Sequence, residues 1–424
     1  MRGRARGRVR FLTALVAACA LAAGCATDSK PLPKATSSAV PGTCLRERRC
    51  LSARDVADLY RIAPLHDRGI RGEGEAVAVV MNSDVNDADI AAFDKMMHIN
   101  GAPAVQRIKV PLPAGAALDP DADKTEATLD VETIRMVAPK ARILLYMAPL
   151  GYFGAAVEQV VADESNPDRG ARTVNYSAGH CTLGETAERR ASYVKALEDA
   201  VKARPVINVF VSSGDHGVFD CHEPNSDNPT WDVTVDYPSS SADAISVGGT
   251  FLERTASGAY LDEAAWENPL VNWGSGGGND PLEARPDWQQ GPGVQNAFSD
   301  GHRQLPDVAA PSDGKFIWPI VVDGKEELVG GTSASSPFWA GVGALFAQLA
   351  QRAGVKDLGM LNKAFYAVAA DNKPNVLFHD IVRGGNLGYD ATPGWDYATG
   401  LGSPIADRLG ATIVRYLRAH PPSP

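Results

Sequence analysis

The sequence predicts an α/β fold in which a parallel central sheet is covered by helices on both faces. Short apolar runs typical of strands alternate with longer stretches typical of helices, and this alternation favours a parallel sheet. No linker divides the chain after Leu51, so we expect one domain over residues 51–424. Hydrophobic residues make up 44% of the 424, which is enough for a large core.

The predicted elements follow these runs in chain order. The strand-like runs are Ala76–Met81, Arg142–Ala148, Arg172–Ser177, Val206–Ser212 and Ala244–Val247. The helix-like stretches are Ala88–Ile99, Thr125–Val137, Ala155–Ala162 and Ala187–Ala203, and a longer helix extends from near Ser333 to about Arg352. Active sites of parallel sheets gather where strands end, so we expect functional side chains just after these strands.

The first 50 residues differ in character from the rest. Residues 1–24 combine five arginines among the first ten residues with an apolar run, Phe11–Gly24, that is too short to span a bilayer. This pattern predicts an export signal. Small residues before Cys25 resemble a bacterial lipobox and predict lipidation of that cysteine, the alternative being an ordinary signal peptide. Residues 25–50 are rich in Pro, Ser, Thr and Lys and predict a tether.

Charge narrows the possible partners. The formal net charge is −10, and a chain this acidic is a poor candidate for binding nucleic acid. We expect contact with a membrane only through the lipid anchor. The predicted protein is therefore an exported bacterial monomer, either a lipoprotein of the cell envelope or a secreted protein.

Four cysteines outside the signal region predict two disulfides, because an even number in an exported chain is typical of disulfide bonding. Three pairings are possible for Cys44, Cys50, Cys181 and Cys221. Proximity in sequence favours Cys44–Cys50, which leaves Cys181–Cys221. The alternative is a metal site at the second pair, since His180, His216 and His222 lie nearby.

Ser333 is the candidate nucleophile. It lies in Gly331-Thr332-Ser333-Ala334-Ser335-Ser336-Pro337, where small residues surround one serine at the start of a long apolar helix. Backbone N–H groups and the positive end of the helix dipole stabilise negative charge that develops beside such a serine. The alternative is a serine that only caps the helix.

The candidate bases are carboxylates. None of the eight histidines has the sequence setting of a catalytic base, whereas Glu126 and Asp130 are four residues apart on one face of a predicted helix. Two such acids repel each other unless they are solvated or share a proton. Asp215 follows a buried strand in a small-residue turn. The alternatives are a solvated acidic helix face and an aspartate that only shapes its turn.

Two glycine-rich segments complete the pattern. Gly276, Gly277 and Gly278 allow close approach of backbone and suit pairing with an extended peptide, the alternative being a flexible loop. Asp380 and Asp396 flank glycine-rich turns, where carboxylates suit a hard cation such as calcium. The alternative is a pair of aspartates that only support turns.

Together these five segments resemble the sedolisin family of serine-carboxyl peptidases, over Leu51 to about Asp407. The resemblance implies a subtilisin-like fold and a peptide or unfolded-protein substrate. It implies that Ser333 is the nucleophile, Glu126 the general base, Asp130 the carboxylate that orients Glu126, and Asp215 the acid of the oxyanion hole. It also places the glycines Gly276 to Gly278 along the substrate.

The resemblance further implies one bound Ca²⁺. Its ligands would be the carboxylates of Asp380 and Asp396 and the backbone carbonyls of Ile381, Thr392 and Gly394. The chain departs from the family pattern at three places: Met81 replaces a glutamate, Ala178 replaces a tryptophan, and Thr392 replaces a glycine. Only about 25 residues separate Cys25 from the predicted catalytic domain, which is too few for the long N-terminal propeptide usual in the family.

The predicted activity is an acid endopeptidase, because Asp215 must carry a proton to hydrogen-bond an oxyanion. Two other functions use the same scaffold. One is a catalytically silent, calcium-stabilised envelope lipoprotein that binds peptides, and the other is an exopeptidase of the tripeptidyl type. Retention of Glu126, Asp130, Asp215 and Ser333 together favours an active enzyme.

Overall fold

The computed structural model describes residues 40–113, 115–119, 122–149, 151–222, 231–312 and 317–422. The predicted export signal and the predicted lipidation site, Cys25, lie outside these residues. Within the described ranges, no helix has the length and apolar character needed to cross a membrane.

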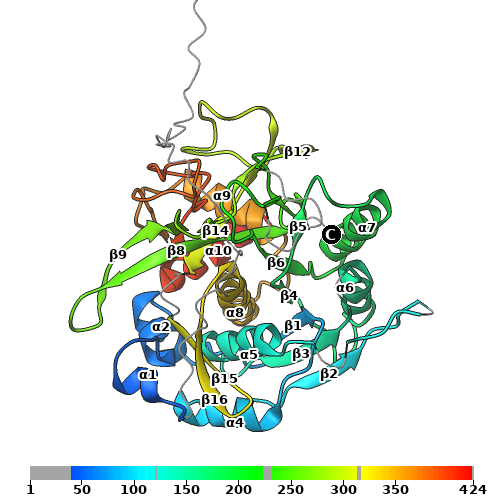
Figure 1. Ribbon diagram of the computed structural model, residues 1–424, viewed down its shortest axis with the longest axis vertical. Coiled ribbons are helices and arrows are strands. Elements are labelled where there is room, and N and C mark those ends of the chain that lie inside the picture. The colour runs from blue at the N-terminus through cyan, green and yellow to red at the C-terminus, as the bar shows by residue number, and fades with distance from the viewer. Residues whose placement is uncertain are drawn as a thin grey trace, which may run out of the picture.

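A central, mostly parallel sheet organises the molecule (Figure 1). Its seven parallel strands run in the spatial order β14-β8-β6-β4-β1-β3-β2, and β9 pairs antiparallel with β8. In chain order the strands are β1 (Ala76–Met81), β2 (Gln106–Lys109), β3 (Arg142–Met147), β4 (Thr173–Tyr176), β6 (Asn208–Ser212), β8 (Ile245–Arg254), β9 (Tyr260–Ala265) and β14 (Val308–Pro311). The change of direction around β1 leaves a switch point in the strand order, where parallel sheets commonly bind ligands.

Helices cover both faces of the sheet, as predicted. One face carries the larger core, built with the helices α2 (Ala53–Leu59), α4 (Asp87–Met96), α5 (Thr125–Val137), α8 (Thr332–Arg352), α9 (Leu361–Ala370) and α10 (Ala406–Ala419). The other face carries α6 (Phe153–Ala162) and α7 (Ala187–Lys202). Helix α8 is almost entirely buried because it packs along β4, β6, β8 and β14. The predicted α/β class, a parallel central sheet with helices on both faces, is confirmed.

Short helices and two-stranded pairs lie outside the main sheet and its covering helices. They are the helices α1 (Thr43–Arg46) and α3 (Ala63–Asp67), the hairpin β15 (Trp318–Val322) with β16 (Lys325–Val329), and the pair β12 (Gly278–Ala284) with β13 (His302–Leu305). Two-residue strands form the pairs β5 (His180–Cys181) with β7 (Asp236–Tyr237), β10 (Glu267–Asn268) with β11 (Trp273–Gly274), and β17 (Phe378–His379) with β18 (Ser403–Pro404).

The folded part begins earlier than the predicted boundary at residue 51. The carboxylate of Glu326, on β16, accepts hydrogen bonds from the backbone N–H groups of Gly42 and Cys44. A Cys44–Cys50 disulfide closes the same segment, and both cysteines are buried. The described residues 40–50, which the sequence analysis assigned to the tether, are therefore attached to the folded part. A second disulfide joins Cys181 to Cys221.

Candidate active site

Ser333 is the second residue of α8 and remains partly exposed, whereas nearly all the residues that follow it in the helix are buried. Gly331 precedes the helix with φ of 100°, a conformation that favours glycine. A Cβ atom at Gly331 would lie 2.5 Å from Oδ2 of Asp215. The glycine therefore lets the start of α8 and the Asp215 turn approach each other closely.

Glu126 and Asp130 occupy successive turns of α5, as predicted, and both belong to the site. The Ser333 side chain lies next to the Glu126 carboxyl and lowers its pKa, against the larger effect of burial. Burial, followed by the nearby charge of Asp215, raises the pKa of Glu126 to about 8. Asp130 is fully buried, and its pKa is raised well above the usual range by burial and then by the negative charge of Glu126. Both shifts favour a proton held by the pair at acidic and neutral pH.

Each of these two carboxyls keeps one buried oxygen without a hydrogen-bond partner in the ranges that the structure describes. The atoms are Oε1 of Glu126 and Oδ2 of Asp130. A proton on either carboxyl supplies the donor that these oxygens lack, since a protonated carboxyl has one O–H group. The arrangement therefore suits an acid pair that holds one proton between its members.

Asp215 lies in the turn after β6, on the other side of the start of α8. Its Oδ1 accepts two hydrogen bonds from Thr332, one from the backbone N–H at 2.7 Å and one from the hydroxyl at 2.7 Å. The first N–H groups of a helix have no partner within the helix, so this carboxyl caps α8 from a distant segment. Burial raises the pKa of Asp215, against the hydrogen bonds from Thr332 and the nearby His216, which lower it.

Three further polar residues, which sequence reasoning missed, form a chain of hydrogen bonds that ends at Asp130. The Ser177 hydroxyl donates to Oδ1 of Asp130 at 2.6 Å, and the Asn175 amide donates to Ser177 Oγ at 3.1 Å. The Ser336 hydroxyl donates to Oδ1 of Asn175 at 2.7 Å. A signal was available: Asn175 and Ser177 alternate along an otherwise apolar buried strand, so both side chains point to one face of the sheet.

The predicted substrate-binding glycines lie beside the Asp215 turn, where the backbone is tightly packed. Gly276 N–H donates to Gly214 O at 2.9 Å, and Gly277 N–H donates to Gly217 O at 3.2 Å. A Cβ atom at Gly276 would lie 2.0 Å from Ser213 O, and one at Gly277 would lie 1.9 Å from Tyr397 O. This packing is reason enough for glycine here, and contact with substrate remains a prediction.

The residues predicted to bind calcium come together in one loop cluster. Oδ1 of Asp380 accepts the Gly394 N–H at 2.9 Å, and Oδ2 of Asp396 accepts the Thr392 N–H at 3.0 Å. Both carboxylates thus face the 392–396 turn. Burial raises the pKa of Asp380 and raises that of Asp396 to about 7. No donor in the described ranges bonds the carbonyls of Ile381, Thr392 and Gly394.

This donor set fits calcium, because two carboxylates and three free carbonyls are hard oxygen ligands and a cation would offset the buried charge. The alternative metal site near the second disulfide finds no support. Among the described residues, no group of three or more His, Cys, Asp or Glu side chains could hold a metal ion. Cys181 and Cys221, which that site would need, are joined in a disulfide.

Comparisons with known proteins agree with this geometry. The model of the subtilase family matches residues 114–380. Kumamolisin from Bacillus sp. (strain MN-32) is 30% identical over 372 residues, covering 84% of this chain and 62% of the relative. Sedolisin from Pseudomonas sp. (strain 101) is 34% identical over 287 residues, covering 64% of this chain and 46% of the relative. The chain thus spans less than two thirds of the length of these curated relatives.

A solved structure extends the likeness to three dimensions. Pseudomonas sedolisin, described as a serine-carboxyl proteinase in complex with two molecules of pseudo-iodotyrostatin, matches with a TM-score of 0.69 and 25% identity. The match covers 87% of this chain and 98% of that chain. The chain therefore belongs to the subtilase family and, within it, to the sedolisin family of serine-carboxyl peptidases.

Proposed function

We propose that this protein is an exported serine-carboxyl endopeptidase that cleaves unfolded proteins at acidic pH. One observation carries the proposal: the Ser333 side chain lies close enough to the Glu126 carboxyl to lower its pKa, while Thr332 holds the Asp215 carboxyl on the other side of the same helix start. A nucleophile thus lies between a carboxyl that can take its proton and a carboxyl that can donate one. A peptide-binding protein without activity has no need for this pairing.

The reaction follows from these positions. Ser333 Oγ attacks the scissile carbonyl carbon and gives its proton to Glu126, while the C=O electron pair moves to oxygen. Protonated Asp215 donates a hydrogen bond to that oxyanion. When the tetrahedral intermediate collapses, the C–N bond breaks and Glu126 returns the proton to the leaving amine. Water then hydrolyses the acyl-enzyme, with Glu126 again accepting a proton and Ser333 regaining one.

The protonation states explain an acidic optimum. An ionised Asp215 would repel the oxyanion, so activity falls as pH rises through the raised pKa of Asp215. Activity also falls as pH drops further, where Glu126 and Asp130 each keep a proton and neither can act as a base. With one proton held by the pair, Glu126 works as base and acid in turn.

Several features of the whole protein belong to the same proposal. Asp380 and Asp396, with the carbonyls of Ile381, Thr392 and Gly394, would hold one calcium ion, which would stabilise the loop cluster by offsetting its negative charge. The two disulfides fit an oxidising compartment outside the cytoplasm. Cys25 would carry a lipid anchor, the protein would act as a monomer, and Gly276 to Gly278 would lie along the substrate.

The test is cleavage of an acid-denatured protein between pH 3 and pH 8, beside a Ser333→Ala variant. We expect cleavage that peaks at acidic pH and falls by roughly 10³-fold or more in Ser333→Ala. Products of one uniform short length would indicate the tripeptidyl type, and internal fragments the endopeptidase. No cleavage by a folded, calcium-loaded protein would replace the proposal with a silent peptide-binding lipoprotein.

A further inference from the structure

Asn175 is an unusual residue for its place in the fold. It lies in β4 at the middle of the sheet, opposite Val79 of β1 and Phe210 of β6, and it is 0% exposed. Its strand neighbours Val174 and Tyr176 pack into the core under α6 and α7, so Asn175 points to the opposite face, toward α8. A β-branched apolar residue suits such a position far better than an amide.

The amide is tolerated because it joins a chain of three hydrogen bonds that run in one direction. The Ser336 hydroxyl donates to Asn175, the Asn175 amide donates to Ser177, and the Ser177 hydroxyl donates to Asp130. The Asn175 amide also lowers the pKa of Asp130 directly. Hydrogen bonds that follow one another in this way polarise each other, and the chain ends on a carboxylate.

The direction of the chain has a physical consequence for Ser177. Its hydroxyl carries one proton and has two acceptors in reach, Asp130 Oδ1 at 2.6 Å and the Ser333 backbone carbonyl at 3.3 Å. A donor at its oxygen occupies one lone pair and restricts the rotation of the O–H group. Asn175 therefore keeps the Ser177 hydroxyl oriented so that it donates its hydrogen bond to Asp130.

The same chain of hydrogen bonds links α8, which carries Ser333, to α5, which carries the acid pair. Ser336 lies one turn after Ser333 on α8, whereas Asp130 lies one turn after Glu126 on α5.

We propose that Asn175 is a positioning residue that fixes the Asp130 carboxylate through Ser177 and ties it to the nucleophile helix through Ser336. This inference rests on the proposed peptidase function for its catalytic consequence, but the positioning itself can be measured without catalysis. Asn175 does not touch the substrate in this proposal and acts only through Asp130.

Few charged groups act on Asp130, so a change in its titration can be attributed to its hydrogen-bond donors. From α5 itself, Glu126 is the one charge that shifts the pKa of Asp130 among the described residues, and β4 contributes only the neutral Asn175 and Ser177. Asp215 and Asp123 act on Glu126 instead. The remaining acids and the arginine near α5 form a separate group around a different carboxyl; they are Asp89, Asp94 and Arg135, around Glu132.

Loss of its hydrogen-bond donors should raise the pKa of Asp130. Donors to a carboxylate stabilise its charged form, so removing them raises the pH at which the acid pair first loses a proton. In Asn175→Val we expect the titration of Asp130 to move up by about half to one pH unit. The acid limb of the kcat/KM profile should move by the same amount, while the limb set by Asp215, which Asn175 does not contact, should stay in place.

The deciding experiment measures the carboxyl titration directly. Protein with ¹³C-labelled aspartate carboxyls is titrated by NMR in a Ser333→Ala background, and Asp130 is assigned with Asp130→Asn. Asn175→Val is compared with Ser177→Ala, which should shift Asp130 in the same direction, and with Ser336→Ala, which should shift it less. Thr173→Val, two residues earlier on β4, is the matched control and should leave the titration unchanged.

The outcomes separate the two proposals. An unchanged Asp130 titration in both Asn175→Val and Ser177→Ala overturns the role of Asn175, whatever the activity. A shift in a protein that cleaves nothing at any pH upholds the positioning while the peptidase function fails. If Asn175→Val does not fold, Ser177→Ala and Ser336→Ala decide the question by the same titration.

Discussion

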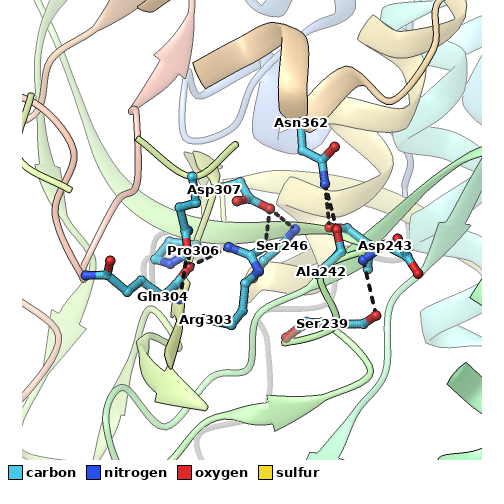
Figure 2. A network of polar contacts seen from close by, with 12 residues as sticks. Ser239, Ala242, Asp243, Ser246, Arg303, Gln304, Pro306, Asp307 and Asn362 are labelled. Carbon is cyan, nitrogen blue, oxygen red and sulfur yellow. Dashed lines mark hydrogen bonds and ion pairs between the residues drawn. The ribbon is translucent and has the colours of Figure 1, made fainter. Parts of the chain in front are cut away.

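Two of the buried carboxylate sites in this molecule are built in opposite ways. The first surrounds Asp307, between β13 and β14 (Figure 2). Its Oδ2 accepts the Ser246 N–H at 2.9 Å and pairs with Arg303 at 2.6 Å, and its Oδ1 accepts the Tyr366 hydroxyl at 3.0 Å. Asp307 and Arg303 are both fully buried. Every oxygen of this carboxylate has a partner, and its charge is balanced.

The second cluster, at the start of α8, lacks that balance. Glu126 and Asp130 face each other without a cation, and each retains an unpartnered buried oxygen within the described residues. Buried like charges cost free energy, and a fold gains nothing from keeping them. The comparison therefore separates a carboxylate that holds two strands together from a pair whose raised pKa values prepare it for proton transfer.

The sharpest test of this contrast replaces Glu126 by its neutral isostere. We expect Glu126→Gln to lower kcat/KM by roughly 10³- to 10⁴-fold, because the base is lost while the shape of the site remains. The same change should leave stability unchanged or improve it, since it removes one member of a repelling pair. Peptide hydrolysis and chemical denaturation, measured on the same preparation, check both parts.

The pH dependence of stability provides the control for that variant. The pKa of Glu126 rises from 4.5 to about 8 on folding, so between these values the folded state holds a proton that the unfolded state releases. Stability from this group is therefore fully present below about pH 4.5 and is lost as pH rises toward 8. Glu126→Gln should flatten this decline. A decline as steep as that of the wild type would show that other groups cause it.

The opposite result is expected at the paired cluster. Asp307→Asn leaves Arg303 buried without its counter-charge, so we expect a loss of about 3–5 kcal/mol in unfolding free energy. Activity per folded molecule should change little at temperatures where the variant remains folded. Urea denaturation followed by tryptophan fluorescence measures the loss. A loss below about 1 kcal/mol would mean that solvent or a neighbouring group takes over the pairing.

The regular part of the fold could be predicted from the sequence because it repeats simple patterns. Ala76–Met81 and Thr125–Val137 have the bounds expected from apolar runs and helical spacing. The structure extends the predicted Ala244–Val247 strand to Arg254, since its second half pairs with β9 and has no apolar run of its own. β14 was missed because its pairing with β8, which is distant in sequence, stabilises it rather than a local pattern. α10 was missed although its buried residues, such as Leu409 and Ile413, recur at helical spacing.

The residues of the candidate site also divide into those that the sequence could indicate and those that it could not. Ser333, Glu126 and Asp215 stand in short motifs and could be chosen from residue type and spacing. Asn175 and Ser177 could not, because their role appears only when β4 lies beside α5 and α8. Polar residues alternating along a buried strand were the available signal. Such residues need partners in the core, although the sequence does not say which partners.

Calcium removal should have a smaller effect than Glu126→Gln or Asp307→Asn, and it concerns a third kind of buried carboxylate. Within the described residues Asp396 has no arginine partner of the kind that Asp307 has. Its carboxylate accepts backbone N–H groups of Thr392, Ala398 and Thr399, yet burial still raises its pKa to about 7. This residual cost is what a bound cation would remove.

We therefore expect calcium at a hundred times its Kd to stabilise the folded chain by about 3 kcal/mol relative to a chelated sample. Thermal denaturation with calcium, with magnesium and with chelator measures this, and Mg²⁺ should substitute poorly because it demands stricter geometry. Asp380→Asn should lose the calcium response, whereas Asp307→Asn should keep it. Equal melting temperatures with calcium and chelator would mean that backbone N–H groups alone stabilise Asp396, which would then belong with Asp307 as a structural carboxylate.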